Sequence, residues 1–112
     1  MREPLDSYRQ IIRSVLTPYA QIAYANVSVR NMTAFDSDSD QYAVLSEGWN
    51  QQRRHHDCLI HVEIRSGKVW VQRDGTEDGV ATELVEAGIP KSDIVLGFHE
   101  PSVRPHTGFA TA

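Results

Sequence analysis

A helical repeat of apolar side chains is the first pattern in the chain. These side chains recur at steps of three and four residues: Leu5, Tyr8, Ile12, Val15 and Tyr19. Such spacing gathers them on one face of a helix, which would pack against the rest of the protein. Because Pro18 disfavours helical geometry at the preceding residue, the pattern predicts a helix that ends or kinks at Thr17.

The period changes to the two-residue alternation of β-strands between Asn26 and Asp74. Four segments alternate in this way or are rich in β-branched residues: 27–35, 41–49, 58–65 and 68–73. Gly48 is expected to break the second segment, and Ser66-Gly67 predicts a two-residue hairpin turn before the last. Because the connections are short, we expect these strands to form an antiparallel meander.

Helical spacing returns in residues 76–88. The apolar face of this segment is formed by four residues: Val80, Ala81, Leu84 and Val85. Gly88 suits the left-handed position that follows a helix, and Pro90 stops the helix and favours a short helical turn. The tail from His99 contains two prolines and is expected to lie extended over the body.

The order of these elements predicts an α+β fold in a single domain that spans residues 1–112. This fold would contain an N-terminal helix, a four-stranded antiparallel β-meander, and a C-terminal helix or helices packed on one sheet face. A chain of this length can bury one modest hydrophobic core.

The predicted hairpin around Ser66-Gly67 determines which side chains share a sheet face. Alternating residues of its two strands would form an aliphatic face: Cys58, Ile60, Val62, Ile64, Val69 and Val71. The opposite face would carry His61, Glu63, Trp70 and Gln72, with Glu63 across from Trp70. A tryptophan among titratable groups indicates a contact surface, since Trp is enriched at binding hot spots. Alternatively, a helix, the tail or a second subunit covers this face.

Turn chemistry accounts for the acid-rich segment DGTE, which contains Asp74, Gly75, Thr76 and Glu77. Asp74-Gly75 would end the preceding strand, and Thr76 would cap the following helix. If Asp74 is the cap instead, Glu77 occupies the capping-box position. An acid pair for catalysis would need a nucleophile and a pocket, and the glycine spacing matches no phosphate or dinucleotide loop. We therefore predict no catalytic residues and no cofactor.

Two segments match metal-binding patterns in part. In DSDSDQYAVLSE, residues 36–47, the acids fit a calcium loop, but Gln41 occupies the position that requires glycine. In HHDCLIH, alternation places His55, Asp57 and His61 on one strand face and Cys58 on the other. Such ligands do not converge unless a histidine from the tail joins them. We therefore predict a polar hairpin loop in the first segment and no metal in either.

Charge and composition narrow the function classes. A net charge of −4 and a pI of about 5.6 argue against a protein that binds DNA without a partner, because such proteins usually present a basic face. The dense basic stretch is RRHH, residues 53–56. We predict weak or no autonomous DNA binding. The single cysteine excludes an internal disulfide, and without a signal peptide or an apolar membrane span the sequence predicts a cytoplasmic protein with no membrane partner.

Several segments carry a family resemblance. They are CLIHVEI, the run GKVWVQRDGTEDGVATELVEAGIPKSDIVLGFH, and the spaced residues Arg104, Thr107, Phe109 and Ala110. SYRQIIRSVL and Gly48-Trp49 fit as well. In these segments the chain resembles the XisI family, the fdxN element excision controlling factors of cyanobacteria. The resemblance implies a small α+β domain that acts beside a site-specific recombinase. It also implies a second accessory factor, XisH, whose family looks nuclease-like.

Three functions follow from the resemblance and the residues. The first is a non-enzymatic accessory factor that binds an XisH-like protein and supports excision of a DNA element by a recombinase. Its partner surface would comprise His61, Glu63, Trp70, Gln72, His99 and Arg104. The second is an antitoxin-like inhibitor of a nuclease partner. The third is a small metal-dependent hydrolase that uses Asp74, Glu77 and the histidines. A homodimer that forms through the Trp70 face is a further alternative.

Overall fold

Five strands and two α-helices make up the fold in the computed structural model, which describes residues 3–22, 24 and 28–112. In chain order they are α1 (Glu3–Leu16), β1 (Ser28–Asp36), β2 (Gln41–Asn50), β3 (Arg53–Arg65), β4 (Lys68–Asp74), α2 (Val80–Glu86) and β5 (Ile94–Leu96). Short 3-10 turns cover Thr17–Gln21, Lys91–Asp93 and Arg104–His106. Asn26 and Val27, where the first strand was expected to begin, lie outside the described residues.

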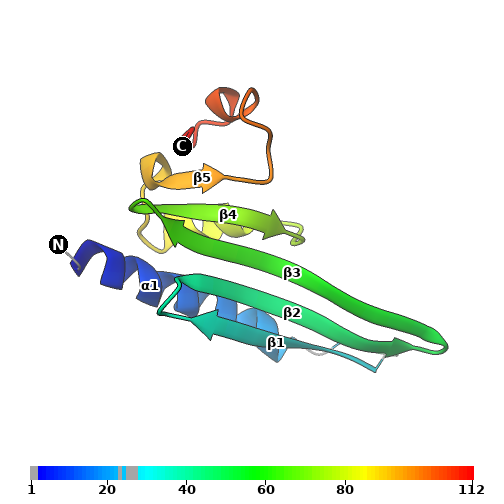
Figure 1. The fold of residues 1–112 in the computed structure, drawn as a ribbon. Helices are drawn as coiled ribbons and strands as arrows, with labels where there is room; N and C mark the ends of the chain where they lie inside the picture. Colours follow the sequence, from blue (N-terminus) through cyan, green and yellow to red (C-terminus); the bar gives the residue numbers. More distant parts are fainter. Residues whose placement is uncertain (1–2, 23, 25–27) are drawn as a thin grey trace.

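The strands form one sheet in the order β1-β2-β3-β4-β5 (Figure 1). The first four strands are antiparallel, and β5 is parallel to β4. The α+β class is therefore confirmed, but the prediction of four strands is wrong. The fifth strand, Ile94–Leu96, has three buried apolar residues and is too short to show a two-residue period. It is parallel because α2 carries the chain back across the sheet before β5 begins.

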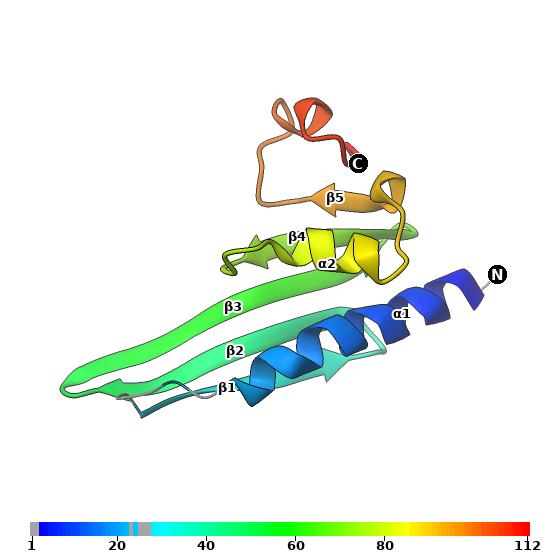
Figure 2. The same ribbon diagram turned by 180° about the vertical axis from the view of Figure 1, so that it is seen from behind.

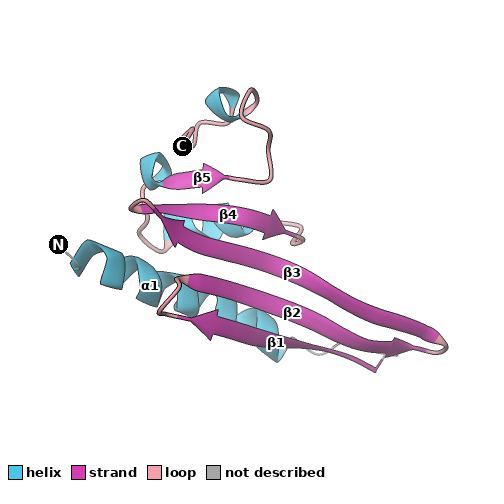
Figure 3. Ribbon diagram, in the orientation of Figure 1, coloured by secondary structure: helices cyan, strands magenta, loops and turns pink. Residues whose placement is uncertain are grey.

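Both α-helices pack on the same face of the sheet (Figures 2 and 3). The hydrophobic core lies between these helices and the sheet. Its fully buried residues include Ile12 and Leu16 of α1, Leu84 of α2, and Ile60 and Val62 of β3. The predicted apolar faces of the two helices are thus confirmed. α1 ends at Leu16 and the chain continues as a 3-10 turn through Pro18, as its position predicts. No helix in the described ranges is long and apolar enough to span a membrane.

A β-bulge in β3 changes which side chains of that strand face the helices. β2 and β3 pair Val44 with Ile60 but Leu45 with Cys58, so Leu59 is an extra residue. One extra residue reverses the alternation of the strand on either side of it. The prediction that Cys58 continues the aliphatic row of Ile60 is therefore wrong. Cys58 lies half-buried on the face opposite the helices, where burial raises the pKa of its thiol.

Two tyrosines join the N-terminal helical segment to the C-terminal half of the chain. The Tyr8 hydroxyl donates to the Asp93 carboxylate, and the Tyr19 hydroxyl donates to the Glu83 carboxylate. The hydrogen bond to Asp93 raises the pKa of Tyr8 to about 12, and burial raises the pKa of Tyr19. Both contacts require the protonated phenol.

Alkaline pH is therefore expected to destabilise the protein through Tyr8. Its pKa is about 12 in the folded state and about 10 in the unfolded state, so its contribution is complete below pH 10 and is lost as pH rises towards 12. Urea unfolding between pH 8 and 12 measures this loss. Tyr8→Phe should lose less stability over the interval than the parent protein. A Tyr8→Phe variant that lost as much stability as the parent over this interval would contradict the expectation.

Candidate functional site

The sheet face opposite the helices contains the predicted partner surface. β3 and β4 pair with Glu63 across from Trp70 and Ile64 across from Val69, so the predicted hairpin register is confirmed. The turn residues Ser66 and Gly67 both have positive φ angles, 54° and 79°, as a two-residue hairpin requires.

Glu63 is the centre of a hydrogen-bond network on this face. Its carboxylate accepts from Gln41 Nε2 at 2.7 Å and from Gln72 Nε2 at 2.8 Å. His61 Nε2 donates to Gln41 Oε1 at 2.6 Å, which extends the network along the strand. These bonds, chiefly the one from Gln41, hold the pKa of the Glu63 carboxyl below its usual range. Glu63 therefore stays ionised and fixed in place at neutral pH.

Trp70 lies beneath two arginine side chains and is only 8% exposed. The Arg65 guanidinium carbon is 3.8 Å from the centre of the indole ring, and that of Arg104 is 5.2 Å away. Both distances fall in the range of cation–π contacts. Arg104 belongs to the tail, so the tail supplies part of the cover over this tryptophan.

The tail reaches Trp70 through a series of turns. It is not extended, because it contains the 3-10 turn Arg104–His106 and closes with a bridge between Ala110 and Val95. Arg104 Nε donates to the His99 carbonyl oxygen at 3.1 Å, so the backbone of His99 holds the guanidinium. A Cβ atom on Gly97 would lie 2.4 Å from Gln72 Oε1, which shows how closely the chain after β5 packs on β4.

The structure thus brings the six residues of the predicted surface together. His61, Glu63 and Gln72 belong to one polar network, while Trp70, Arg104 and the backbone of His99 form a second group beside it. Sequence reasoning missed two members. Arg65 follows Glu63 in the same alternation and could have been found. Gln41 could not have been found from the sequence, because its pairing with Glu63 depends on the register between β2 and β3.

The Asp74 segment shapes the entry into α2. The Asp74 carboxylate accepts from the Thr76 amide at 3.0 Å and from the Val80 amide at 2.8 Å, and Thr76 Oγ1 accepts from the Gly79 amide at 3.2 Å. α2 begins at Val80, so the prediction of a helix capped directly by Thr76 is wrong. Gly79 has φ 87°, which no residue of a right-handed helix adopts. Glu77 is exposed, and the Gly75 amide donates to the Leu59 carbonyl.

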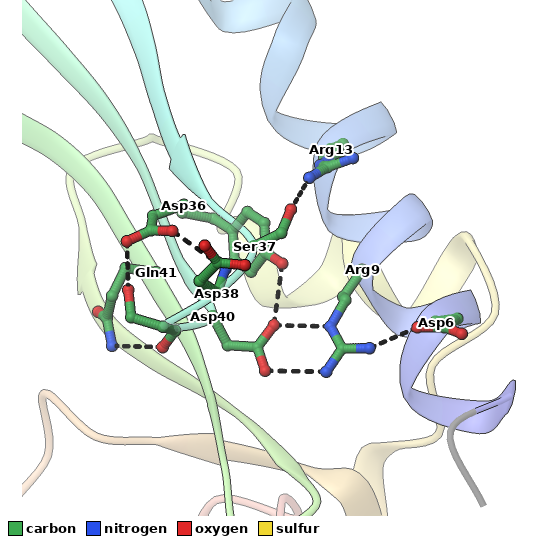
Figure 4. Close-up of polar contacts among 10 residues, drawn as sticks. Asp6, Arg9, Arg13, Asp36, Ser37, Asp38, Asp40 and Gln41 are labelled. Atoms are coloured by element: carbon green, nitrogen blue, oxygen red, sulfur yellow. Dashed lines mark hydrogen bonds and ion pairs between the residues drawn. The ribbon is translucent and has the colours of Figure 1, made fainter.

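The acidic loop between β1 and β2 is tied to α1 (Figure 4). Arg9 donates to both carboxylate oxygens of Asp40, at 2.7 and 3.0 Å, and Arg13 donates to Ser37. Asp36 accepts from within the loop, chiefly from Ser39 Oγ at 2.8 Å, which lowers the pKa of Asp36. Within the described ranges no three His, Cys, Asp or Glu side chains gather as a metal site would require.

The bulge at Leu59 also separates the histidines of HHDCLIH. His55 and Asp57 lie on the helix side of the sheet, where His55 Nε2 is 3.1 Å from Ser46 Oγ. His61 lies on the opposite side with Gln41. The prediction that His55, Asp57 and His61 share one face is therefore wrong. A serine beside a histidine matches part of a nucleophile–base pair, but Asp57 accepts from the Cys58 amide and pairs with Arg73.

Comparison with known proteins identifies the family. The model of the XisI family, described as XisI protein, matches residues 2–111. The crystal structure of a XisI-like protein from Anabaena variabilis ATCC 29413 is 33% identical, with 96% of this chain and 99% of that chain covered and a TM-score of 0.89. That of the fdxN element excision controlling factor XisI from the same strain is 34% identical, with 97% and 99% covered and a TM-score of 0.82. No curated protein matches. The chain therefore belongs to the XisI family.

Proposed function

We propose that the protein is a non-enzymatic accessory factor that binds a protein partner through the face around Trp70. A relative that is 34% identical is an fdxN element excision controlling factor, which supports a role in the excision of a DNA element by a recombinase. The observation that carries the proposal is the stacking of Arg65 and Arg104 on one tryptophan. Such a cluster presents two guanidinium groups in fixed positions on one face, as a binding surface does.

The arginines make the contact in this proposal, and Trp70 supports them. A tryptophan that is 8% exposed has little apolar area left for a partner to bury. The Arg65 side chain, by contrast, is 52% exposed. A guanidinium held over an indole ring loses less conformational freedom on binding than a free one, and arginine is enriched at interface hot spots.

The partner should present carboxylates to this face. A planar guanidinium binds a carboxylate through two parallel hydrogen bonds, which fixes orientation as well as affinity. The ionised Glu63 beneath Arg65 adds a negative charge that would repel a misplaced acid and so restrict the docking geometry. An XisH-like protein, which the family resemblance implies, is the partner that we propose.

Removal of both arginines is expected to weaken this complex. The double variant Arg65→Ala/Arg104→Ala should bind the XisH-like protein encoded beside the gene at least about tenfold more weakly, since hot-spot arginines contribute about 2 kcal/mol or more. Isothermal titration calorimetry with the two purified proteins measures the affinity. Arg53→Ala, which removes an exposed arginine from the far end of the sheet, is the matched control and should bind as the parent does.

A folded double variant with unchanged affinity would refute the proposed surface. Circular dichroism and urea unfolding of the same preparation separate this outcome from simple loss of structure. An excision assay with the recombinase and its DNA element then tests the wider role. There, the double variant should excise less product than the parent protein.

A further inference from the structure

The hairpin that joins β2 to β3 extends beyond both helices (Figures 1 and 2). We refer to residues 48–57 as the arm. Nine consecutive residues of the arm, from Trp49 to Asp57, are exposed. Gln51 takes a positive φ of 58° at the turn, so the two strands reverse within two residues and stay paired up to the tip. The arm is therefore a narrow two-stranded ribbon.

Positive charge is concentrated on this ribbon in a chain that is acidic as a whole. The arm contains Arg53, Arg54, His55 and His56, and its one acid, Asp57, pairs with Arg73. The acid at the base of the arm, Glu47, accepts from Arg30 at 2.7 Å and from Arg54 at 2.9 Å. These hydrogen bonds lower the pKa of Glu47, and the two arginines more than offset its charge.

The acidic loop lies at the other end of β2. Asp36, Asp38 and Asp40 precede β2, and the arm begins near the other end of this strand. Ten residues of extended chain separate the two ends by about 33 Å, since each residue of a strand advances about 3.3 Å. A polyanion is therefore attracted chiefly to the arm, because the loop, whose Asp40 pairs with Arg9, has no excess of positive charge.

An exposed tryptophan accompanies the charges. Trp49 is 51% exposed, and the guanidinium carbon of Arg54 is 5.6 Å from the centre of its ring. Asn50, Gln51 and Gln52 add amide groups at the tip that can donate and accept hydrogen bonds. Guanidinium groups that contact phosphates, together with an aromatic ring that stacks on bases, are the combination with which proteins bind nucleic acids.

We propose that the arm binds nucleic acid, with Arg53 and Arg54 on the phosphate backbone and Trp49 against the bases or sugars. A two-stranded ribbon is narrow enough to enter the major groove of B-DNA. Because the arm neutralises only two or three phosphates, the contact is weak, in keeping with the weak autonomous DNA binding expected from the sequence. The inference rests on the arm alone and holds whether or not the Trp70 face binds a partner.

Fluorescence anisotropy with the full chain and a labelled 20-bp duplex or a 20-nucleotide single strand tests the proposal. For the duplex, affinity should fall about 10- to 40-fold between 50 and 200 mM NaCl, as expected for two or three phosphate contacts. Arg53→Gln/Arg54→Gln should reduce binding at 50 mM NaCl at least about tenfold. Lys68→Gln/Lys91→Gln makes the same charge change outside the arm and should have little effect. Binding should also quench Trp49 emission, because Trp70 is buried.

Three results would overturn the proposal. The first is the absence of any anisotropy change at 50 mM NaCl with either DNA. The second is an equal loss of binding in the two double variants, which would indicate a response to net charge without a defined site. The third is equally tight binding of a labelled polyglutamate peptide of 20 residues, which would make the arm a site for acidic proteins. The Arg65→Ala/Arg104→Ala variant should bind DNA like the parent, so failure of either proposal leaves the other testable.

Discussion

Gly48→Ala is expected to destabilise the protein by about 3–5 kcal/mol, a loss in the range of the most severe single substitutions. A Cβ atom at this position would lie 1.9 Å from the Ser28 carbonyl oxygen and 2.7 Å from the Val29 Cα. Both are backbone atoms, so they can yield only if β1 moves away from β2. Gly48 also has φ +150°, which side chains of L-residues rarely adopt.

Urea unfolding of Gly48→Ala measures this loss, with Gly67→Ala as the control. Gly67 also has a positive φ, 79°, but a Cβ there would meet nothing within 4 Å. The control therefore carries the conformational cost without the clash and should lose only about 1 kcal/mol. Similar losses of stability in the two variants would contradict the close approach of β1 to β2 at Gly48. The same contact explains why Gly48 does not break β2, contrary to the sequence prediction.

Trp70→Ala is expected to cost about 3–5 kcal/mol, the usual cost of removing a large aromatic side chain from a packed position. Trp70 is 8% exposed and contacts Arg65, Arg104 and the backbone at Gly97. Its removal would leave a cavity between β4 and the tail and would release the Arg104 guanidinium. We therefore expect the tail to become sensitive to proteolysis in this variant.

Trp49→Ala provides a matched control, because it makes the same substitution at a site that is 51% exposed. Its cost should be less than about 1 kcal/mol. Urea unfolding followed by circular dichroism compares the two variants, and limited proteolysis reports on the tail. If Trp70→Ala proved as stable as Trp49→Ala, the tail would not be packed on the tryptophan in solution. The arginine cluster of the proposed partner surface would then lose its support.

The two proposed contacts occupy different parts of the molecule. The Trp70 face lies where β4, β5 and the tail meet, and the arm projects from the other end of β3 (Figure 1). A protein with this arrangement could hold a partner at one end while its arm touches nucleic acid at the other. Such a bridge agrees with the proposed accessory role and with the weak DNA binding that the acidic composition predicts.

The sequence by itself determined the elements whose signals are local. The apolar stripe of α1 and the stop at Pro18 depend on residues within one helix, so their prediction is confirmed. The two-residue turn at Ser66-Gly67 sets the β3–β4 register from Arg65–Lys68 to Val62–Val71, and the register shifts only beyond these pairs, between Val62 and His61. That register was sufficient to gather His61, Glu63, Trp70 and Gln72 on one face.

Only the tertiary structure decided the features that depend on residues far apart in the chain. The bulge at Leu59 reverses the faces of Cys58 and His55, and no signal near it in the sequence requires an extra residue there. β5 exists because Ile94–Leu96 find the open edge of β4. Gln41 reaches Glu63 through pairing across 22 positions, and Trp70 is covered by an arginine 34 positions further along the chain. Burial of apolar surface and hydrogen bonding stabilise any side chains that the fold places side by side, however far apart they are in the sequence. A local sequence pattern therefore cannot reveal these contacts.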